Sequence, residues 1–185
     1  MRNDMKDDNE VEYYGKKVKD IVRKLIADEK LVTDFYRDAV LAVNPESRGE
    51  IAETFRDIAD DEYGDHYVGL VDFACKWLGC KVPYGYDETK KLGCKLNWEL
   101  ASKLARGKGP EYYVKKAIES EKDAIKDYEE AIKVLDEDLD SDSHADAGNL
   151  KGLLVKIYYD EIEHLEMLDM LLHNVLAYDE MEDKE

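Results

Sequence analysis

Apolar residues along the chain recur at spacings of three and four, with charged residues at the positions between them. This spacing is typical of amphipathic helices, and the alternation that marks half-buried strands is absent. We therefore predict an all-α protein. The apolar pattern divides into four long runs, which predict helices over residues 12–43, 45–78, 110–137 and 148–177.

Turn-forming residues separate the predicted helices. Pro45 and Pro110 stand where the second and third helices would begin, a position that suits proline. The turn at 43–45 and the polar stretch at 140–148 each join two neighbouring helices. We therefore expect each joined pair to form an antiparallel hairpin.

A longer segment, residues 80–109, separates the two hairpins. It is too long for a tight turn and contains glycine, proline and a candidate short helix near 98–105. Its length suits a crossover connection between the hairpins. At 185 residues, the chain as a whole suits one domain with one core.

Each predicted helix carries a polar residue where its apolar stripe should continue. In the first helix this residue is Glu29, and in the third it is Glu121. In the fourth helix, Glu161 and His164 occupy two such positions. They share one helical face because they are three residues apart. The stripes therefore predict that acid and imidazole side chains lie in the core.

The second helix has the same interruption but leaves one choice open. Glu62 interrupts the stripe, and Asp65 and His66 follow it at three and four residues. Both spacings keep a side chain on the same helical face. Either residue could therefore join Glu62, and we favour His66.

Four buried carboxylates need a neutralising charge, because desolvation and mutual repulsion both oppose their ionisation. No lysine or arginine falls on the stripe positions. Two divalent cations would neutralise the carboxylates and accept lone pairs from the imidazoles. Mixed carboxylate and imidazole ligation favours iron or manganese over calcium or structural zinc. We therefore predict two iron ions, with manganese as the alternative.

Four segments carry a resemblance to a known family. The first and third helices read LIADEKLVTDFYRDA and AIESEKDAIKDYEEA, and each places a tyrosine (Tyr36 and Tyr128) seven residues after its glutamate. The fourth helix reads YYDEIEHLEML and contains Glu-x-x-His. These segments resemble the ferritin-like superfamily, especially its rubrerythrin and bacterioferritin branch. The second helix, IADDEYGDHYVGL, departs from the pattern because its histidine comes one residue later.

This resemblance implies a ferritin-like antiparallel four-helix bundle with a long crossover between its second and third helices. It also implies a set of metal ligands, namely Glu29, Glu62, His66, Glu121, Glu161 and His164. Three tyrosines lie along the same faces and could hydrogen-bond the carboxylates, namely Tyr36, Tyr128 and Tyr158.

The same resemblance implies a di-iron oxidoreductase that oxidises Fe(II) with O2 or peroxide, as ferroxidases and rubrerythrin-type peroxidases do. The chain has no paired C-x-x-C motifs and so lacks a rubredoxin-like module. Peroxidase turnover would therefore need an external electron donor. Three alternatives stay open: a subunit of a homo-oligomeric iron-storage cage, a di-iron oxygenase acting on an organic substrate, and a metal-free structural bundle.

Composition narrows the expected partners and location. Acidic residues outnumber basic ones by 45 to 27, and the formal net charge of -18 disfavours binding to nucleic acid or to anionic membranes. No segment is apolar enough for a signal peptide or a membrane span, so we expect a cytoplasmic protein. The three cysteines, Cys75, Cys80 and Cys94, form no C-x-x-C pair. We expect reduced packing thiols rather than disulfides or a zinc site.

Overall fold

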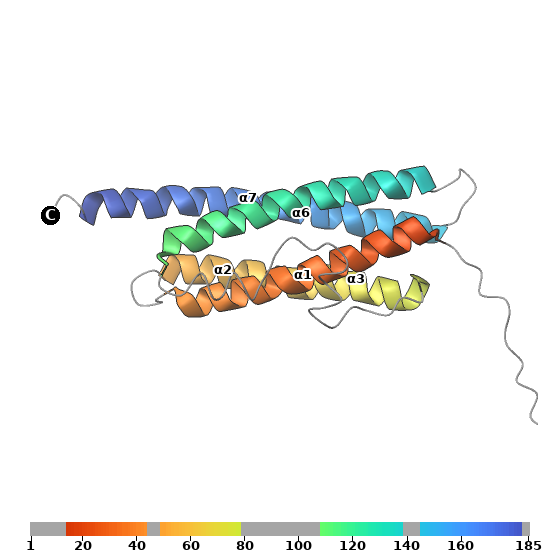
Figure 1. Ribbon diagram of the computed structural model, residues 1–185, viewed down its shortest axis with the longest axis horizontal. Coiled ribbons are helices and arrows are strands. Elements are labelled where there is room, and N and C mark those ends of the chain that lie inside the picture. The colour runs from red at the N-terminus through yellow and green to blue at the C-terminus, as the bar shows by residue number, and fades with distance from the viewer. Residues whose placement is uncertain (1–13, 44–48, 79–107, 139–144, 183–185) are drawn as a thin grey trace, which may run out of the picture.

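The structure is a computed structural model that describes residues 14–43, 49–78, 108–138 and 145–182 (Figure 1). The first helix is α1 (Lys16–Ala42). The second consists of successive segments, which are α2 (Gly49–Asp61), the π-helix η1 (Glu62–Tyr67), α3 (Val68–Phe73) and the π-helix η2 (Ala74–Leu78). The third and fourth are α6 (Pro110–Asp138) and α7 (Ala145–Glu182).

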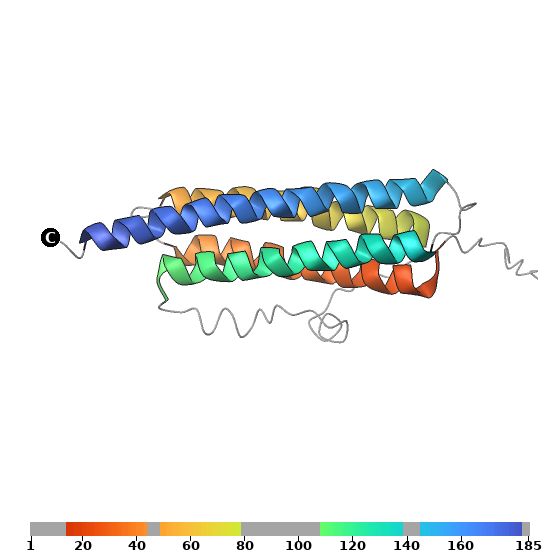
Figure 2. The ribbon, with the colours of Figure 1, turned by 90° about the horizontal axis from the view of Figure 1, so that it is seen from above.

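The four helices lie side by side as a bundle (Figures 1 and 2). The helix α1 runs antiparallel to α2, and α6 runs antiparallel to α7, so both predicted hairpins are present (Figure 1). The second and third helices run in the same direction, which places Leu78 and Pro110 at opposite ends of the bundle. The crossover itself, predicted over 80–109 with a short helix near 98–105, lies outside the described residues.

Local chemistry accounts for the helix ends. Before α1, Gly15 has extended backbone (φ -63°, ψ 164°), so the helix begins at residue 16 and not at 12 as predicted. Pro110 and Glu111 open α6, where a missing N–H and a negative charge are both favourable. The helix α7 continues to residue 182, beyond the predicted 177, because no glycine or proline follows to stop it. The predicted start of the second helix, residue 45, lies outside the described residues.

Apolar side chains fill the bundle in two separate layers. One layer, here called the Leu25 layer, includes Val22, Leu25, Leu70, Leu135 and Leu154. The other, here called the Phe55 layer, includes Phe35, Tyr36, Phe55, Val114 and Leu168. Burial of such side chains is the main favourable contribution to folding. Within the described residues, no helix combines the length and the apolar character that crossing a membrane requires.

Candidate metal centre

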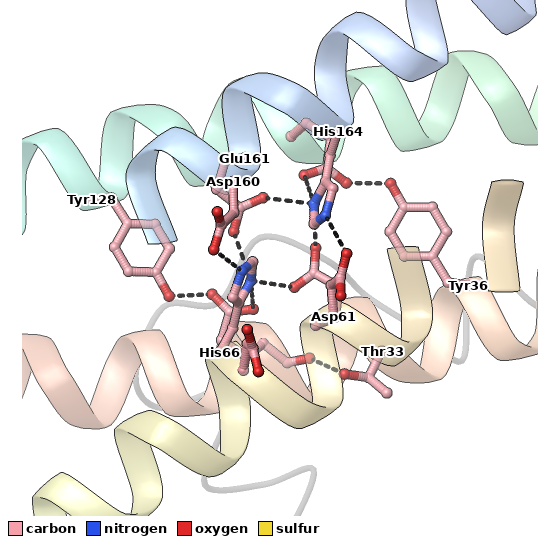
Figure 3. Close-up of polar contacts among 12 residues, drawn as sticks. Thr33, Tyr36, Asp61, His66, Tyr128, Asp160, Glu161 and His164 are labelled. Atoms are coloured by element: carbon pink, nitrogen blue, oxygen red, sulfur yellow. Dashed lines mark hydrogen bonds and ion pairs between the residues drawn. The ribbon is translucent and has the colours of Figure 1, made fainter. Parts of the chain in front are cut away.

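A polar layer separates the two apolar layers. All six predicted ligand side chains lie in it and are buried, namely Glu29, Glu62, His66, Glu121, Glu161 and His164. They come from all four helices, and Figure 3 shows three of them, His66, Glu161 and His164, pointing toward one another in the middle of the bundle. Each stands where the apolar stripe of its helix is interrupted, so helix packing itself carries it into the centre.

The six residues form two overlapping groups. In one group, ligand atoms of Glu29, Glu62, His66 and Glu161 all lie within 4.8 Å of one another. In the other group, the same holds for Glu62, Glu121, Glu161 and His164. Two glutamates, Glu62 and Glu161, belong to both groups. The geometry is that of two neighbouring cation positions with two shared carboxylates.

The two groups can be described as two half-sites. In the Glu29–His66 half, the two ligands that are not shared come from the first hairpin. In the Glu121–His164 half, the two unshared ligands come from the second hairpin. The rings of His66 and His164 have centroids 5.6 Å apart. The shared glutamates come one from each hairpin. Docking of the two hairpins therefore completes both half-sites.

The π-helix η1 decides which residue of the second helix enters the polar layer. Its wider turns hold more residues than α-helical turns, and His66, four residues after Glu62, points inward and is fully buried. Asp65 is exposed and pairs with Lys156, with 2.8 Å between Oδ2 and Nζ. The structure thus places His66, and not Asp65, beside Glu62.

Protons balance the charge of the cluster when no metal is bound. Burial raises the pKa of Glu29 and Glu121 well above the usual range, and the neighbouring carboxylates Glu62 and Glu161 raise it further. Burial also acts to raise the pKa values of Glu62 and Glu161, but hydrogen bonds from neighbouring acids and imidazoles outweigh it and lower both. Within each neighbouring pair, one carboxyl therefore holds its proton more strongly than the other.

The two histidines supply the positive charge. Burial acts to lower the pKa of each imidazole, but hydrogen bonds to the carboxylates outweigh it. The pKa of His164 rises to about 10, and that of His66 also rises. Protonated imidazoles beside ionised carboxylates reduce the net negative charge of the cluster.

Several buried polar atoms make no hydrogen bond of normal geometry. Within the described chain, besides Arg23 Nε, these atoms are Glu29 Oε2, Glu62 Oε1, Glu121 Oε2, both carboxylate oxygens of Glu161, and His164 Nδ1. Each such atom costs about 1–3 kcal/mol when buried unpaired. Apart from Arg23 Nε, all of them belong to residues of the two groups and are of the types that ligate metals. The donor set therefore fits two metal cations, and its mixture of oxygen and imidazole nitrogen suits iron.

One solved structure matches the chain closely in architecture. It is the bacterioferritin-related protein from Bacteroides fragilis, described as a dodecameric thioferritin, with a TM-score of 0.69 over 90% of each chain. The chain has the ferritin-like four-helix-bundle fold. This confirms the predicted fold class, although the two sequences are only 17% identical. No protein-family model matches the sequence, and a search of curated proteins finds no similar sequence.

Tyrosines and aspartates surround the centre of this ferritin-like bundle. The hydroxyl of Tyr128 donates to Glu29, and that of Tyr36 donates to Glu121 (Figure 3). Burial raises the pKa of both tyrosines well above the usual value, so both stay protonated as donors. Tyr158, the third tyrosine of the prediction, packs against the Leu25 layer.

Two aspartates that the sequence analysis missed lie behind the histidines. The Oδ2 atom of Asp160 is 3.4 Å from His66 Nε2, and that of Asp61 is 3.6 Å from His164 Nε2. Such carboxylates fix the ring orientation of a ligating histidine. In the sequence each aspartate directly precedes a shared glutamate, but no apolar stripe marks either position.

Two further polar residues among those that the structure describes, His173 and Cys75, take no part in the centre. His173 is exposed on α7, and His144 lies outside the described residues. Cys75 is exposed, so the prediction that it is a packing thiol is wrong. Its place on a π-turn near the end of the second helix turns it outward. Cys80 and Cys94 lie outside the described residues.

Proposed function

We propose that the protein binds two iron ions in the polar layer and oxidises Fe(II) with O2 or peroxide. The observation that carries this proposal is the set of buried carboxylate and imidazole atoms that lack hydrogen-bond partners. A metal-free bundle would have to satisfy these atoms by hydrogen bonds. In the described residues none of these atoms makes a hydrogen bond of normal geometry, although imidazole nitrogens lie 3.3–3.6 Å from several of them.

The proposed roles follow from the two half-sites. Glu62 and Glu161 would bridge the two ions, and each ion would gain one further carboxylate and one imidazole. Asp160 and Asp61 would hold the imidazoles, and Tyr128 and Tyr36 would hold the outer carboxylates. Manganese would fit the same donor types, and iron is preferred because the set resembles di-iron sites.

As substrate, iron would supply the electrons. Two Fe(II) ions give up one electron each, which together with two protons reduces one hydrogen peroxide to two waters. The protein would contribute the closely spaced positions and the apolar layers that exclude bulk water from them. Repeated turnover without release of Fe(III) would need an external electron donor.

A storage cage built from many copies is the second candidate. The matched structure is described as a dodecamer, and it aligns over 90% of both chains. The net charge of -18 would favour uptake of cations by such an assembly. We therefore also propose that the chain forms a homo-oligomer, which the native mass in solution would test directly.

Iron counting tests the main proposal. The purified protein is loaded aerobically with excess Fe(II), loose iron is removed with a chelator, and bound iron per chain is measured. We expect about two irons per chain, lost in Glu161→Ala. The matched control is Glu163→Ala, which removes an exposed carboxylate from the same helix and should keep both irons.

Two other outcomes would redirect the proposal. An iron count far above two, in a protein of high native mass, would make the storage cage the main function. No tightly bound iron in the unchanged protein would overturn the iron proposal. In that case, the same count with Mn(II) would separate a manganese site from a metal-free bundle.

A further inference from the structure

The ligands of the two half-sites correspond pair by pair. Glu29 corresponds to Glu121, and each is held by a tyrosine from the opposite helix. His66 corresponds to His164, and each is held by an aspartate from the opposite helix. Because the ligands correspond in this way, the two half-sites can differ only through the residues that surround the ligands.

Lys156 is the first such residue. Its Nζ lies 2.8 Å from Asp160 Oδ2 and 2.8 Å from Asp65 Oδ2. The same Asp160 oxygen is the one that faces His66 Nε2. Lys156 therefore fixes the aspartate that orients His66, and it ties that aspartate to η1, the element that carries His66 itself.

Lys24 likewise joins two aspartates from different helices, beside Glu29. We call each lysine, together with the two aspartates that it joins, a clamp. Its Nζ lies 3.0 Å from Asp28 Oδ2 on its own helix and 2.6 Å from Asp127 Oδ2 on α6. Asp28 directly precedes Glu29, and Asp127 directly precedes Tyr128, the tyrosine that donates to Glu29. This clamp therefore joins the two backbones that bring Glu29 and its donor together.

The Glu121–His164 half has different residues at the corresponding positions. Lys156 stands five residues before Glu161, and Asp57 stands five residues before Glu62. Asp61, which faces His164, has a side chain 63% exposed, against 29% for Asp160. In the part of the chain that the structure describes, no lysine or arginine pairs with Asp61.

The counterpart of the Lys24 clamp is also missing. Lys116 stands five residues before Glu121, as Lys24 does before Glu29, but it pairs with Glu119 on its own helix. Ser120 and Phe35 stand where the clamp has Asp28 and Asp127. Among the described residues, the Glu29–His66 half thus has both lysine clamps, and the Glu121–His164 half has neither.

We propose that Lys156 and Lys24 are positioning residues that make the Glu29–His66 half the first to bind metal. A ligand set already held in its bound geometry loses less conformational freedom on binding. Outer partners of metal ligands typically change affinity by about 10–100-fold. We expect the clamped half to bind about tenfold more tightly than its neighbour. This inference rests on the proposed metal site.

Crystals of the full chain grown with one equivalent of Co(II) test the order of binding. Anomalous diffraction locates cobalt at each half-site and needs no catalytic turnover. We expect most of the cobalt at the Glu29–His66 half. Equal occupancy, or more cobalt at the Glu121–His164 half, would overturn the inference and leave the proposed function standing. No cobalt at either half would overturn the proposed function, and the inference with it.

Lysine variants test the cause of the order. Lys156→Met should bring the two cobalt occupancies toward equality, and Lys156→Arg, which keeps the charge and the donors, should retain most of the difference. Lys151→Met is the matched control, because Lys151 also stands half-exposed on α7 and pairs across to Asp136. An occupancy ratio unchanged in Lys156→Met, or changed equally in the control, would overturn the role of Lys156.

Lys24→Met tests the second clamp in the same crystals. Its removal should also bring the two occupancies together, since Glu29 and Tyr128 lose the link between their backbones. Circular dichroism of each variant reports whether the helices are intact. If Lys24→Met loses its fold, the unchanged protein and the Lys156 variants still decide the order and its cause.

Discussion

Phe55 and Glu121 are both completely buried, and both contact Tyr36. The ring of Tyr36 meets Phe55 edge-on, with centroids 5.5 Å apart, while its hydroxyl donates to Glu121. Burial has opposite consequences on the two sides of this tyrosine. It stabilises the bundle through Phe55, whereas it costs free energy at a carboxyl that must stay protonated or find a counterion.

The apolar layers and the polar layer have different roles within one bundle. The Leu25 and Phe55 layers hold the helices together, and the polar layer between them holds groups that destabilise the metal-free fold. Metal ions would turn this cost into a gain, because they bind atoms that are otherwise unpaired. Stability and metal content should therefore respond differently to changes in the two kinds of layer.

The largest expected effect is stabilisation by metal. Each ion that binds only the folded state adds about 4 kcal/mol when its free concentration is about 1,000 times its Kd. For a domain of this size, each kcal/mol raises Tm by about 2–4 °C. Calorimetry of metal-free and Mn(II)-loaded protein measures this shift. Glu161→Ala should show no comparable gain, and an equal gain in that variant would mean that the ions stabilise the fold elsewhere.

The next largest effect comes from substituting one residue in an apolar layer and one in the polar layer. Phe55→Ala should lower the free energy of unfolding by about 3–5 kcal/mol, because it leaves a cavity in the Phe55 layer. Its metal count should be unchanged in conditions where it is folded. Glu121→Leu should lose metal at the Glu121–His164 half and leave the metal-free protein equally or more stable.

Denaturant unfolding of the metal-free proteins, with metal counts of the loaded ones, checks this pair of expectations. If Glu121→Leu were as destabilising as Phe55→Ala, the polar layer would be supporting the fold by itself. A matched control for the cavity is Phe55→Leu, which should lose much less stability and keep the metal.

A smaller effect concerns pH. In the metal-free cluster the raised pKa values of Glu29, Glu121, His66 and His164 favour bound protons, and the pKa of His164 is about 10. All four must release them to bind metal, so affinity should rise as pH rises toward 10. Each released proton contributes about 1.4 kcal/mol per pH unit. Calorimetric titration with Mn(II) in buffers of different ionisation enthalpy counts the protons, and an affinity independent of pH would contradict the protonated cluster.

The smallest expected effect is a gain in stability that leaves the metal centre unchanged. Gly152 lies inside α7 with open space around the position of a Cβ atom. Gly152→Ala should stabilise the fold by about 0.4–1 kcal/mol by restricting the unfolded chain. Metal content and the order of metal binding should not change. Thermal unfolding detects the gain, and a loss of metal in this variant would show that α7 must flex to accept the ions.

The sequence was sufficient to predict the polar layer because burial on a helix is periodic. Glu29, Glu121 and Glu161 each interrupt a regular apolar stripe, and the interruption is visible without coordinates. The choice between Asp65 and His66 was not decidable in this way. Both are compatible with an α-helical face, and only the π-helical turns of η1 show which one enters the core.

Contacts outside the periodic core were also beyond prediction from the sequence. Asp61 and Asp160 are partly exposed, so no stripe marks them. The lysine clamps depend on how closely α1 approaches α6 and η1 approaches α7, which spacing along one helix does not determine. The helix ends depended on Gly15 and on the absence of a stop signal near 177, which are weak local effects.

In genetic terms, η1 has the form of a one-residue insertion that the second helix has absorbed. Removal of the codon for Asp65 would leave Glu62 and His66 three residues apart, which is the spacing of Glu161 and His164 on α7. The same deletion would remove one of the two carboxylates that Lys156 holds. A single codon thus separates the present chain from one in which both hairpins carry Glu-x-x-His at the same spacing.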